Sequence, residues 1–328
     1  MFFIPTQLSL PGLRTIICKP HTLIPYKQAN NKNMKKLTIG LGEVLWDLLP
    51  EGRKLGGAPA NFAYFTQQFG NEAIAISAVG NDNLATETIE ALMRHGLKFI
   101  TPPTPFPTGT VSVELDSNGI PTYVINEGVA WDNIPLTAEM GKAARQCDAV
   151  CWGTLAQRSD ISRKSIQKII SLTRTDCLRI FDINLRGTFY TKEIIECSLK
   201  SCSILKINDE EFHIVTEMFG YGKPAYEAGC KRIMEDFAIN TIILTCGAIG
   251  SYVFTANGGL SYIETPKVEV ADTVGAGDSF TGTFCSALLA KLPIAEAHRL
   301  AVDVSAYVCT QHGAMPELPE KITAKIPR

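Results

Sequence analysis

The residues best suited to chemistry lie at 272–278, with the sequence Asp-Thr-Val-Gly-Ala-Gly-Asp. Gly275 and Gly277 permit tight turns and close approach of a ligand to the backbone, and the apolar run at 279–289 predicts that a helix follows. The first N–H groups of a helix have no partner within it and attract anions, above all phosphate. Asp278 therefore stands where an anion should bind. A carboxylate there can offset the helix dipole, but it can also act as a general base beside a bound phosphoryl group.

Four other short motifs follow apolar, strand-like runs. They are Gly-Gly-Ala-Pro-Ala-Asn at 56–61, Asp-Ile-Asn-Leu-Arg at 182–186, Asn-Asp-Glu-Glu at 208–211 and Thr-Cys-Gly-Ala-Ile-Gly at 245–250. Each has an ordinary structural interpretation by itself, such as a helix N-cap at Asn208, a surface ion pair at Arg186, or a turn at Gly247 and Gly250. Together, and in this order, they predict a ligand site.

Several common catalytic motifs are missing from the sequence. It contains no GxxxxGK[ST] phosphate loop, no GxSxG nucleophile elbow and no HExxH helix. The Gly-Leu-Gly at 40–42 lacks the third glycine of a dinucleotide fingerprint and is weak evidence. The five histidines show no spacing typical of metal ligands.

Strand-like and helix-like segments alternate from residue 37 onward. Short apolar runs typical of buried strands occur at 37–41, 73–79, 149–152, 179–182, 204–207 and 241–245. Helical patterns occur at 58–69, 84–95, 161–173 and 209–218. This alternation predicts an α/β fold with a doubly wound, mainly parallel sheet flanked by helices. Ligands of such sheets bind outside the carboxyl ends of the strands.

Two stretches interrupt this alternation and predict a small β-sheet lid with strands from about 43–55 and 108–126. Residues 110–115 and 122–126 alternate in polarity around the turn sequence Asp-Ser-Asn-Gly, which is typical of a hairpin. Residues 43–49 and 54–55 form a second candidate strand pair. A lid would exclude water from a phosphoryl transfer that otherwise leaks to hydrolysis.

The composition is that of a globular protein, since 45% of the 328 residues are hydrophobic and 20% are charged. A net charge of −2 gives no general attraction to nucleic acid or to an anionic membrane, and no apolar run reaches the ~20 residues that span a bilayer. The ten cysteines are scattered without CxxC spacing, so we interpret them as reduced core residues of a cytoplasmic protein.

The first 33 residues differ from the rest because they contain four prolines and no sustained periodicity. They lack the continuous apolar stretch of a signal peptide. We expect residues 1–33 to be an extension that is disordered or not native, with Met34 as the natural start or the start of the fold, and residues 34–328 to form one domain.

Residues 36–319 resemble the PfkB/ribokinase-like family of carbohydrate kinases. The stretch 56–61 is similar to the family's GG-x-x-x-N motif and 272–278 to its specific DTxGAGD motif. Together with the Gly-Glu-Val-Leu-Trp-Asp at 42–47, the first motif is most similar to fructokinases.

The resemblance implies an ATP-dependent sugar kinase in which Asp278 is the general base for a primary hydroxyl. The backbone N–H groups of Gly275, Ala276 and Gly277 would stabilise the transferring phosphoryl group. The other implied residues are Asp47, Gly57 and Asn61 for sugar hydroxyls, Arg186 for phosphate, Thr245, Gly247 and Gly250 for the nucleotide phosphates, and 306–313 for adenine. Asn208 and Glu211 would order Mg²⁺ through water. Carbonyls near Asp272, Val274 and Gly313 would hold K⁺.

The expected acceptor is an unphosphorylated sugar, fructose first, because residues 110–126 contain no Lys or Arg for a second phosphate. Ribose, 2-keto-3-deoxygluconate and nucleosides stay open as alternatives, with Trp131 and Tyr123 as candidate platforms for a nucleobase. A sugar- or nucleotide-binding regulator without turnover is a second hypothesis, which the intact Asp278 and its glycines disfavour. We also expect a homodimer through the lid sheet, because free sheet edges invite pairing.

Overall fold

A nine-stranded, mainly parallel sheet lies at the centre of the computed structural model, which describes residues 35–49, 52–115 and 121–327. The strand order is β13-β12-β11-β10-β9-β8-β1-β4-β5. The strands are β1 (Leu37–Leu41), β4 (Glu72–Ile76), β5 (Lys98–Ile100), β8 (Ala149–Trp152), β9 (Leu178–Asp182), β10 (Ile204–Asn208), β11 (Thr241–Thr245), β12 (Gly250–Thr255) and β13 (Leu260–Glu264). Neighbours run parallel except for β12, which is antiparallel to both β11 and β13.

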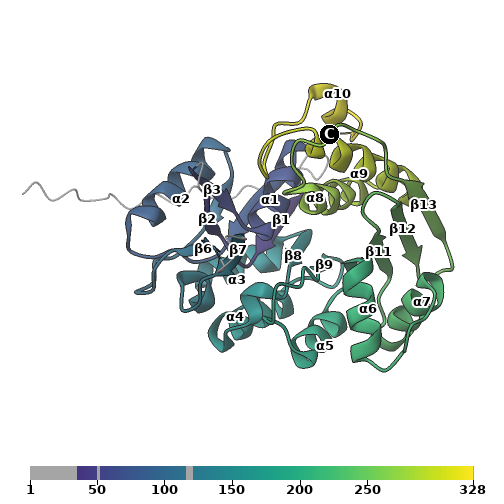
Figure 1. Cartoon of the computed structure of the whole chain (residues 1–328), viewed down its shortest axis with the longest axis horizontal. Helices are drawn as coiled ribbons and strands as arrows, with labels where there is room; N and C mark the ends of the chain where they lie inside the picture. The colour runs from purple at the N-terminus through teal and green to yellow at the C-terminus, as the bar shows by residue number, and fades with distance from the viewer. Residues whose placement is uncertain (1–34, 50–51, 116–120, 328) are drawn as a thin grey trace, which may run out of the picture. The chain divides into compact units, whose positions relative to one another are not determined.

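Helices cover both faces of this sheet (Figure 1). One layer holds α1 (Ala58–Gln68), α2 (Asn83–Arg94), α8 (Ala276–Leu289), α9 (Ile294–Cys309) and the short α10 (Glu320–Thr323). The other holds α3 (Ala138–Gln146), α4 (Asp160–Ser171), α5 (Lys192–Ser201), α6 (Asp209–Met218) and α7 (Tyr226–Phe237). The predicted doubly wound α/β sheet is therefore confirmed.

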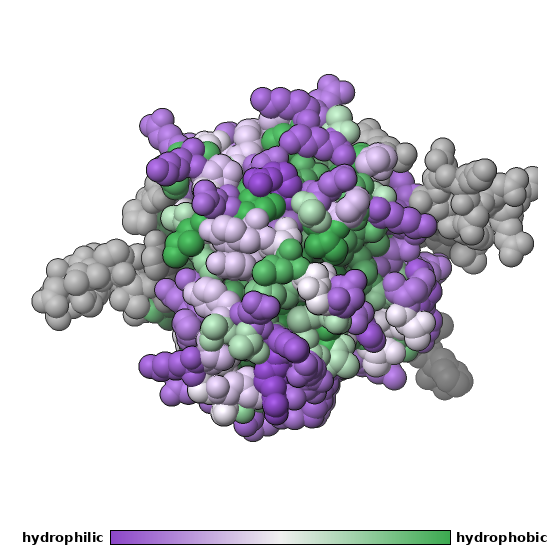
Figure 2. All heavy atoms as spheres, turned by 90° about the vertical axis from the view of Figure 1, so that its right-hand side faces the viewer, coloured by the Kyte–Doolittle hydropathy of each residue, from purple (hydrophilic) through white to green (hydrophobic). Residues whose placement is uncertain are grey.

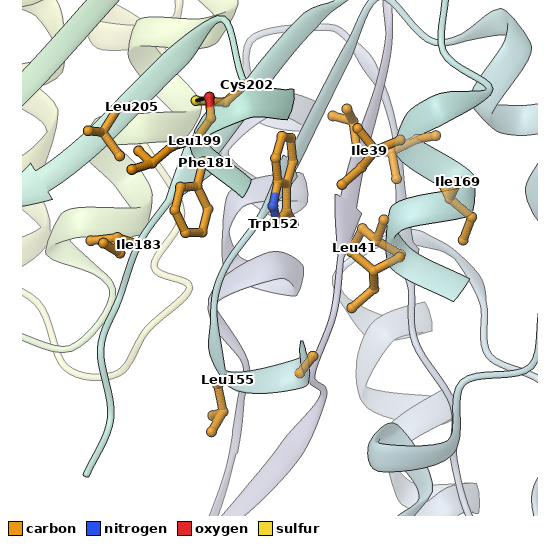
Figure 3. Close-up of a cluster of buried hydrophobic side chains, with 14 of the residues drawn as sticks. Ile39, Leu41, Trp152, Leu155, Ile169, Phe181, Ile183, Leu199, Cys202 and Leu205 are labelled. Carbon is orange, nitrogen blue, oxygen red and sulfur yellow. Dashed lines mark hydrogen bonds between the residues drawn. The ribbon is translucent and has the colours of Figure 1, made fainter. Parts of the chain in front are cut away.

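The central strands are apolar on both faces, which explains why they read as continuous hydrophobic runs. In β8, Val150 and Trp152 pack into the α3–α7 layer, while Ala149 and Cys151 pack into the α1–α8–α9 layer. Figure 3 shows Trp152 standing beside Phe181 of β9, with their ring centroids 5.8 Å apart. Trp152 Nε1 donates to Ser198 Oγ of α5 at 3.3 Å, so these rings pack between the sheet and α5.

Close contact between α1 and β1 fixes the position of the first predicted ligand motif. A Cβ atom at Gly40 would lie 1.8 Å from the carbonyl oxygen of Pro59, so only glycine allows this approach. Pro59 lies in the first turn of α1, where its missing N–H costs no hydrogen bond. The packing places Gly57 and Asn61 at the carboxyl end of β1.

A separate small sheet has the order β3-β2-β6-β7 and contains the strands predicted for the lid. They are β2 (Leu45–Leu49), β3 (Gly52–Gly56), β6 (Gly109–Leu115) and β7 (Pro121–Ile125). Parallel pairing of β2 with β6 joins the two predicted strand pairs. The predicted extension 1–33 and the residues 50–51 and 116–120 lie outside the described residues.

Most element boundaries agree with the sequence expectations, and the differences concern ends and omissions. Strand β4 ends at Ile76 rather than 79, and β10 includes Asn208. The sequence patterns did not predict β5, β12, β13 or the helices α3, α5, α7, α9 and α10. Helix α8 begins at Ala276 instead of 279, which places Gly277 and Asp278 inside its first turn.

Strand β13 forms one edge of the large sheet. Its Leu260 and Tyr262 are 54% and 43% exposed. The molecule's face on this side carries apolar side chains in its middle with polar groups around them (Figure 2). All nine described cysteines are free thiols, seven of them buried, and within the described ranges no helix is long and apolar enough to cross a membrane.

A buried ion pair joins the segment after β7 to the main domain. The guanidinium of Arg158 donates to both carboxylate oxygens of Asp132, at 2.8 and 2.9 Å, and both side chains are 6% exposed. Arg158 also donates to the carbonyl of Asn126 and stacks over the rings of Trp131 and Phe189. This guanidinium therefore links three segments of the chain.

Replacing Asp132 with alanine is expected to destabilise the protein by about 3–5 kcal/mol, because it leaves the buried Arg158 charge unpaired. Urea unfolding would measure the loss. Asp160→Ala is the matched control, since Asp160 is 71% exposed where it pairs with Arg163, and such pairs contribute at most about 1 kcal/mol. Equal losses in the two variants would contradict the role given to the buried pair.

Candidate active site

The first turn of α8 presents backbone donors to a cavity. Its N-cap, Gly275, has a left-handed conformation (φ 78°), and a Cβ atom there would lie 2.4 Å from the carbonyl oxygen of Ala314. The N–H of Ala276 donates to Thr273 at 3.3 Å. Those of Gly275, Gly277 and Asp278 donate to no group among the described residues. The loop thus offers free N–H groups at the positive end of a helix.

Asp278 lies in the same turn and is held by Asn61, whose Nδ2 donates to Asp278 Oδ2 at 2.7 Å. The pKa of Asp278 is raised to about 6, mainly by burial and also by the charge of Asp182. The hydrogen bond from Asn61 and the charges of Lys206 and Arg186 act in the opposite direction. A carboxylate with such a pKa is ionised at neutral pH and still basic enough to take a proton.

A cavity of about 600 Å³, here called the lid-side cavity, lies between the small sheet and α8. It brings together the residues expected to bind a sugar and phosphate, namely Asp47, Gly57, Asn61, Arg186, Gly275 and Asp278. Apolar side chains add to its lining, namely Leu45, Val111, Ile125, Leu155 and Phe189, and Val111 lies beside Asp47 in the register of the small sheet. The cavity can therefore take a ligand that carries both hydroxyl groups and a less polar surface.

A second cavity of about 710 Å³, the helix-side cavity, lies between β11–β12 and α8–α9. It is lined by Thr245, Gly247, Gly250 and Ala276, as expected of a nucleotide site. Of the stretch 306–313 that was predicted to bind adenine, Ala306 and Cys309 line this cavity. Asn208, Thr273 and Gly277 line both cavities, so the two ligands would meet at the first turn of α8.

Lys206 is a site residue that the sequence patterns did not reveal. It is buried on β10, with its Nζ 3.1 Å from Asp182 Oδ1, and a Cβ atom at Gly277 would lie 3.1 Å from that Nζ. Burial opposes its charge, but the carboxylates of Asp182, Glu211 and Asp278 together raise its pKa. A fixed positive charge therefore lies directly beside the free N–H groups of α8. The available signal was a lysine inside the apolar run 204–207.

Glu43 is the other missed residue. It lines the lid-side cavity and is 4% exposed. Burial raises its pKa to about 7. It lies inside the fructokinase-like stretch 42–47, but the resemblance gave it no role.

Asn208 and Glu211 form a reciprocal cap at the start of α6. Asn208 Oδ1 accepts the Glu211 N–H at 2.8 Å, and Glu211 Oε2 accepts the Asn208 N–H at 2.9 Å. Glu211 Oε1 accepts the N–H of Leu185, also at 2.9 Å, and Glu211 lines neither cavity. The carboxylates of Asp209 and Glu210 line the helix-side cavity instead. Within the described ranges no cluster of three His, Cys, Asp or Glu could hold a metal ion.

The loop before α8 brings the three candidate K⁺-site residues together. Asp272 accepts the N–H of Val274 at 3.0 Å and that of Gly313 at 3.1 Å. Two aromatic residues were predicted as platforms for a nucleobase. Trp131 is fully buried against Arg158 and lines neither cavity, so this prediction is wrong for Trp131. The side chain of Tyr123 lies outside the described residues.

Comparison with known proteins places this site in a family. The model of the pfkB family of carbohydrate kinases matches residues 51–321. The chain belongs to this family. The protein is therefore a carbohydrate kinase, a phosphotransferase acting on a hydroxyl group.

Several relatives of this kinase match along most of their length. An ATP-dependent 6-phosphofructokinase of Thermoanaerobacterium thermosaccharolyticum is 26% identical over 90% of this chain and 94% of its own. A fructokinase of Vibrio alginolyticus is 24% identical over 85% and 94%. The structure of a Xylella fastidiosa fructokinase with bound ATP superposes with a TM-score of 0.76 at 17% identity, covering 89% of this chain and 98% of that one, and shows the same fold.

Proposed function

We propose that this kinase transfers the γ-phosphate of ATP to the primary hydroxyl of an unphosphorylated sugar, fructose first. The observation that carries the proposal is the place of Asp278, where the two cavities meet beside free backbone N–H groups. Asp278 takes the proton of the hydroxyl while that oxygen bonds to the γ-phosphorus. The bond from phosphorus to the bridging oxygen breaks, and ADP leaves with its electron pair.

The remaining residues bind and orient the two substrates. Asp47, Gly57 and Asn61 hold sugar hydroxyls. The N–H groups of Gly275, Gly277 and Asp278 stabilise charge on the phosphoryl group, and Arg186 pairs with its oxygens. Thr245, Gly247 and Gly250 line the triphosphate. Lys206, beside Gly277, adds a positive charge to this anion site.

Mg²⁺ and K⁺ complete the proposal. Asn208, which Glu211 holds by a hydrogen bond, orders Mg²⁺ through water. Asp209 and Glu210 also line the helix-side cavity, and such acidic residues suit a hydrated cation. When bound, Mg²⁺ neutralises charge on the phosphates. Backbone carbonyls near Asp272, Val274 and Gly313 form the K⁺ site, and their proximity around one carboxylate supports it.

The absence of basic residues at the lid end supports fructose over fructose 6-phosphate, although one relative is a 6-phosphofructokinase. Among the described residues, Arg186 and Lys206 are the only basic ones that line the lid-side cavity. Both side chains pair with the phosphate that is transferred. Strand β3 does carry Arg53 and Lys54, but Arg53 pairs with Glu87 and Lys54 lies opposite Asp47 in the sheet register. A second phosphate therefore lacks a partner in the lining.

The apolar residues that line the lid-side cavity favour a nucleoside as the second candidate. Phe189, Leu155 and Val111 are weakly polar lining residues, against which a base could pack. Phe189 takes the place of Trp131 as the aromatic group available to such a ligand. Ribose and 2-keto-3-deoxygluconate stay as further alternatives.

A substrate panel tests the acceptor directly. With ATP and Mg²⁺, and with or without K⁺, we expect kcat/KM for fructose to exceed that for fructose 6-phosphate by at least about 100-fold, since a buried, unpaired phosphate charge costs several kcal/mol. Ribose, 2-keto-3-deoxygluconate and a purine nucleoside complete the panel. A preference for fructose 6-phosphate would overturn the argument from the lining, and a preference for the nucleoside would support the second candidate.

Two further proposals concern the protein's surroundings. The small sheet has β3 and β7 as its two edges, and we propose that it pairs with a second copy to form a homodimer.

The nine free thiols among the described residues support a reducing compartment, for which we propose the cytoplasm.

A further inference from the structure

Glu43 lies between the start of α1 and the lid-side cavity. Its carboxylate accepts the backbone N–H of Glu43 itself and that of Ala58, and its backbone carbonyl lies where a Cβ atom at Gly57 would approach to 2.4 Å. The side chain is 4% exposed and lines the cavity. Its Oε2 has no hydrogen-bond partner among the described residues. A buried carboxyl with an unused oxygen is costly to maintain, which points to a ligand that uses it.

The charges around Glu43 come from several elements. Arg186, in the segment after β9, and Asp278, on α8, act on it directly, and Asp47 and Lys206 line the same cavity. The pKa of Glu43 is raised to about 7, mainly by burial and also by the negative charge of Asp278, although its backbone hydrogen bonds and the charge of Arg186 lower it. Near neutral pH Asp278 is therefore mainly ionised, whereas a large fraction of Glu43 is protonated.

We propose that Glu43 is a substrate-contacting residue which, in its neutral form, donates a hydrogen bond from its carboxyl group to an oxygen of the acceptor sugar. This inference rests on the proposed function. The terminal torsion of a glutamate is broad, so a small rotation turns the O–H toward the cavity while the other oxygen keeps the Ala58 N–H. Asp47 and Asp278 accept hydrogen bonds from the sugar, and Glu43 supplies a donor.

A neutral Glu43 also suits the reaction that takes place beside it. An ionised carboxylate would add a further negative charge near Asp278, in the region where the triphosphate arrives, and like charges in a cavity of low dielectric repel strongly. A protonated carboxyl provides the same geometry without that charge. Sugar binding should therefore select the protonated form of Glu43 and weaken as the pH rises above its pKa.

Titration calorimetry with fructose between pH 6 and 8.5 tests the proposal in wild type and in Glu43→Gln. For the wild type, Kd should rise above pH 7 toward tenfold per pH unit, and binding at pH 8 should take up close to one proton per sugar. Glu43→Gln keeps an oxygen for the Ala58 N–H and a permanent donor. Its Kd should be independent of pH in this range and lower than that of the wild type at pH 8.5.

Asp47→Asn is the matched control, because it alters another carboxyl of the same cavity. It should weaken fructose binding at every pH and retain the rise above pH 7. A wild-type Kd that does not change with pH, or a Glu43→Gln variant that retains the rise, would overturn the proposal. So would a Glu43→Gln variant with wild-type melting temperature that binds no sugar, since the ionised form would then be the one required.

The substrate panel separates this inference from the proposed function. If wild type phosphorylates a sugar other than fructose, the same titration is run with that sugar. If it phosphorylates none of the panel, the proposed function fails. An active enzyme whose substrate Kd is flat from pH 6 to 8.5 rejects the role of Glu43 alone.

Discussion

Asp278→Asn is expected to lower kcat by about 10²–10⁴-fold, the usual contribution of a positioned general base, while the Kd for the sugar stays within the same order of magnitude. The amide oxygen can still accept the hydrogen bond that Asn61 Nδ2 now donates at 2.7 Å, so the first turn of α8 should keep its geometry. The substitution removes the proton acceptor and little else. Steady-state kinetics and sugar titration of the same preparation would separate the two effects.

The pH dependence gives a second measurement on the same residue. Because the pKa of Asp278 is raised to about 6, its ionised form is lost as the pH falls through that value. Wild-type kcat/KM should then decrease about tenfold per unit below pH 6, and the residual activity of Asp278→Asn should lack this decrease. A variant whose kcat stays within tenfold of wild type would show that another group accepts the proton.

Gly275→Ala is expected to reduce kcat by about 10²–10³-fold, as does the loss of an oxyanion-hole donor in other enzymes. The new methyl group would lie 2.4 Å from the carbonyl oxygen of Ala314 and 2.9 Å from its Cα, at a φ of 78°. Backbone atoms cannot rotate away, so the loop must shift and carry the N–H groups of Gly277 and Asp278 with it. The sugar Kd should change less than kcat.

Gly258→Ala separates backbone strain from steric displacement. Gly258 has a similar φ of 84°, and a Cβ atom added there would meet no other atom within 4 Å. It lies in the turn between β12 and β13 and lines neither cavity. We expect a loss of about 1 kcal/mol in unfolding free energy and unchanged kinetics. If both variants lose activity equally, the contact with Ala314 is not the cause.

The central fold could be predicted because its strands are buried on both faces, and such strands have an unambiguous sequence pattern. The runs 37–41, 149–152 and 241–245 match β1, β8 and β11 residue for residue. Helix α9 could also have been found, since its buried Ala297, Leu300, Ala301 and Val304 recur at helical spacing. The antiparallel β12 was obscured because Gly250 was interpreted only as part of a phosphate-binding motif.

The site was harder to predict where one spacing serves two purposes. An Asn followed three residues later by Glu fits both a water-mediated metal site and a reciprocal helix cap, and only the hydrogen bonds of Glu211 to Asn208 and Leu185 reveal the cap. The pKa values of Lys206 and Glu43 depend on burial and on charged side chains such as Asp278, which comes from a distant segment of the chain. Sequence spacing contains no such information, because the partners come from distant segments.

The lining that the two cavities share has a consequence for ligand design. Since Asn208, Thr273 and Gly277 border both spaces, a compound that joins a sugar to a nucleoside through a short polyphosphate bridge could occupy both at once. Once one half is bound, the other binds as an intramolecular partner at high effective concentration. Such a bisubstrate compound would draw its selectivity for the sugar from the lid-side lining.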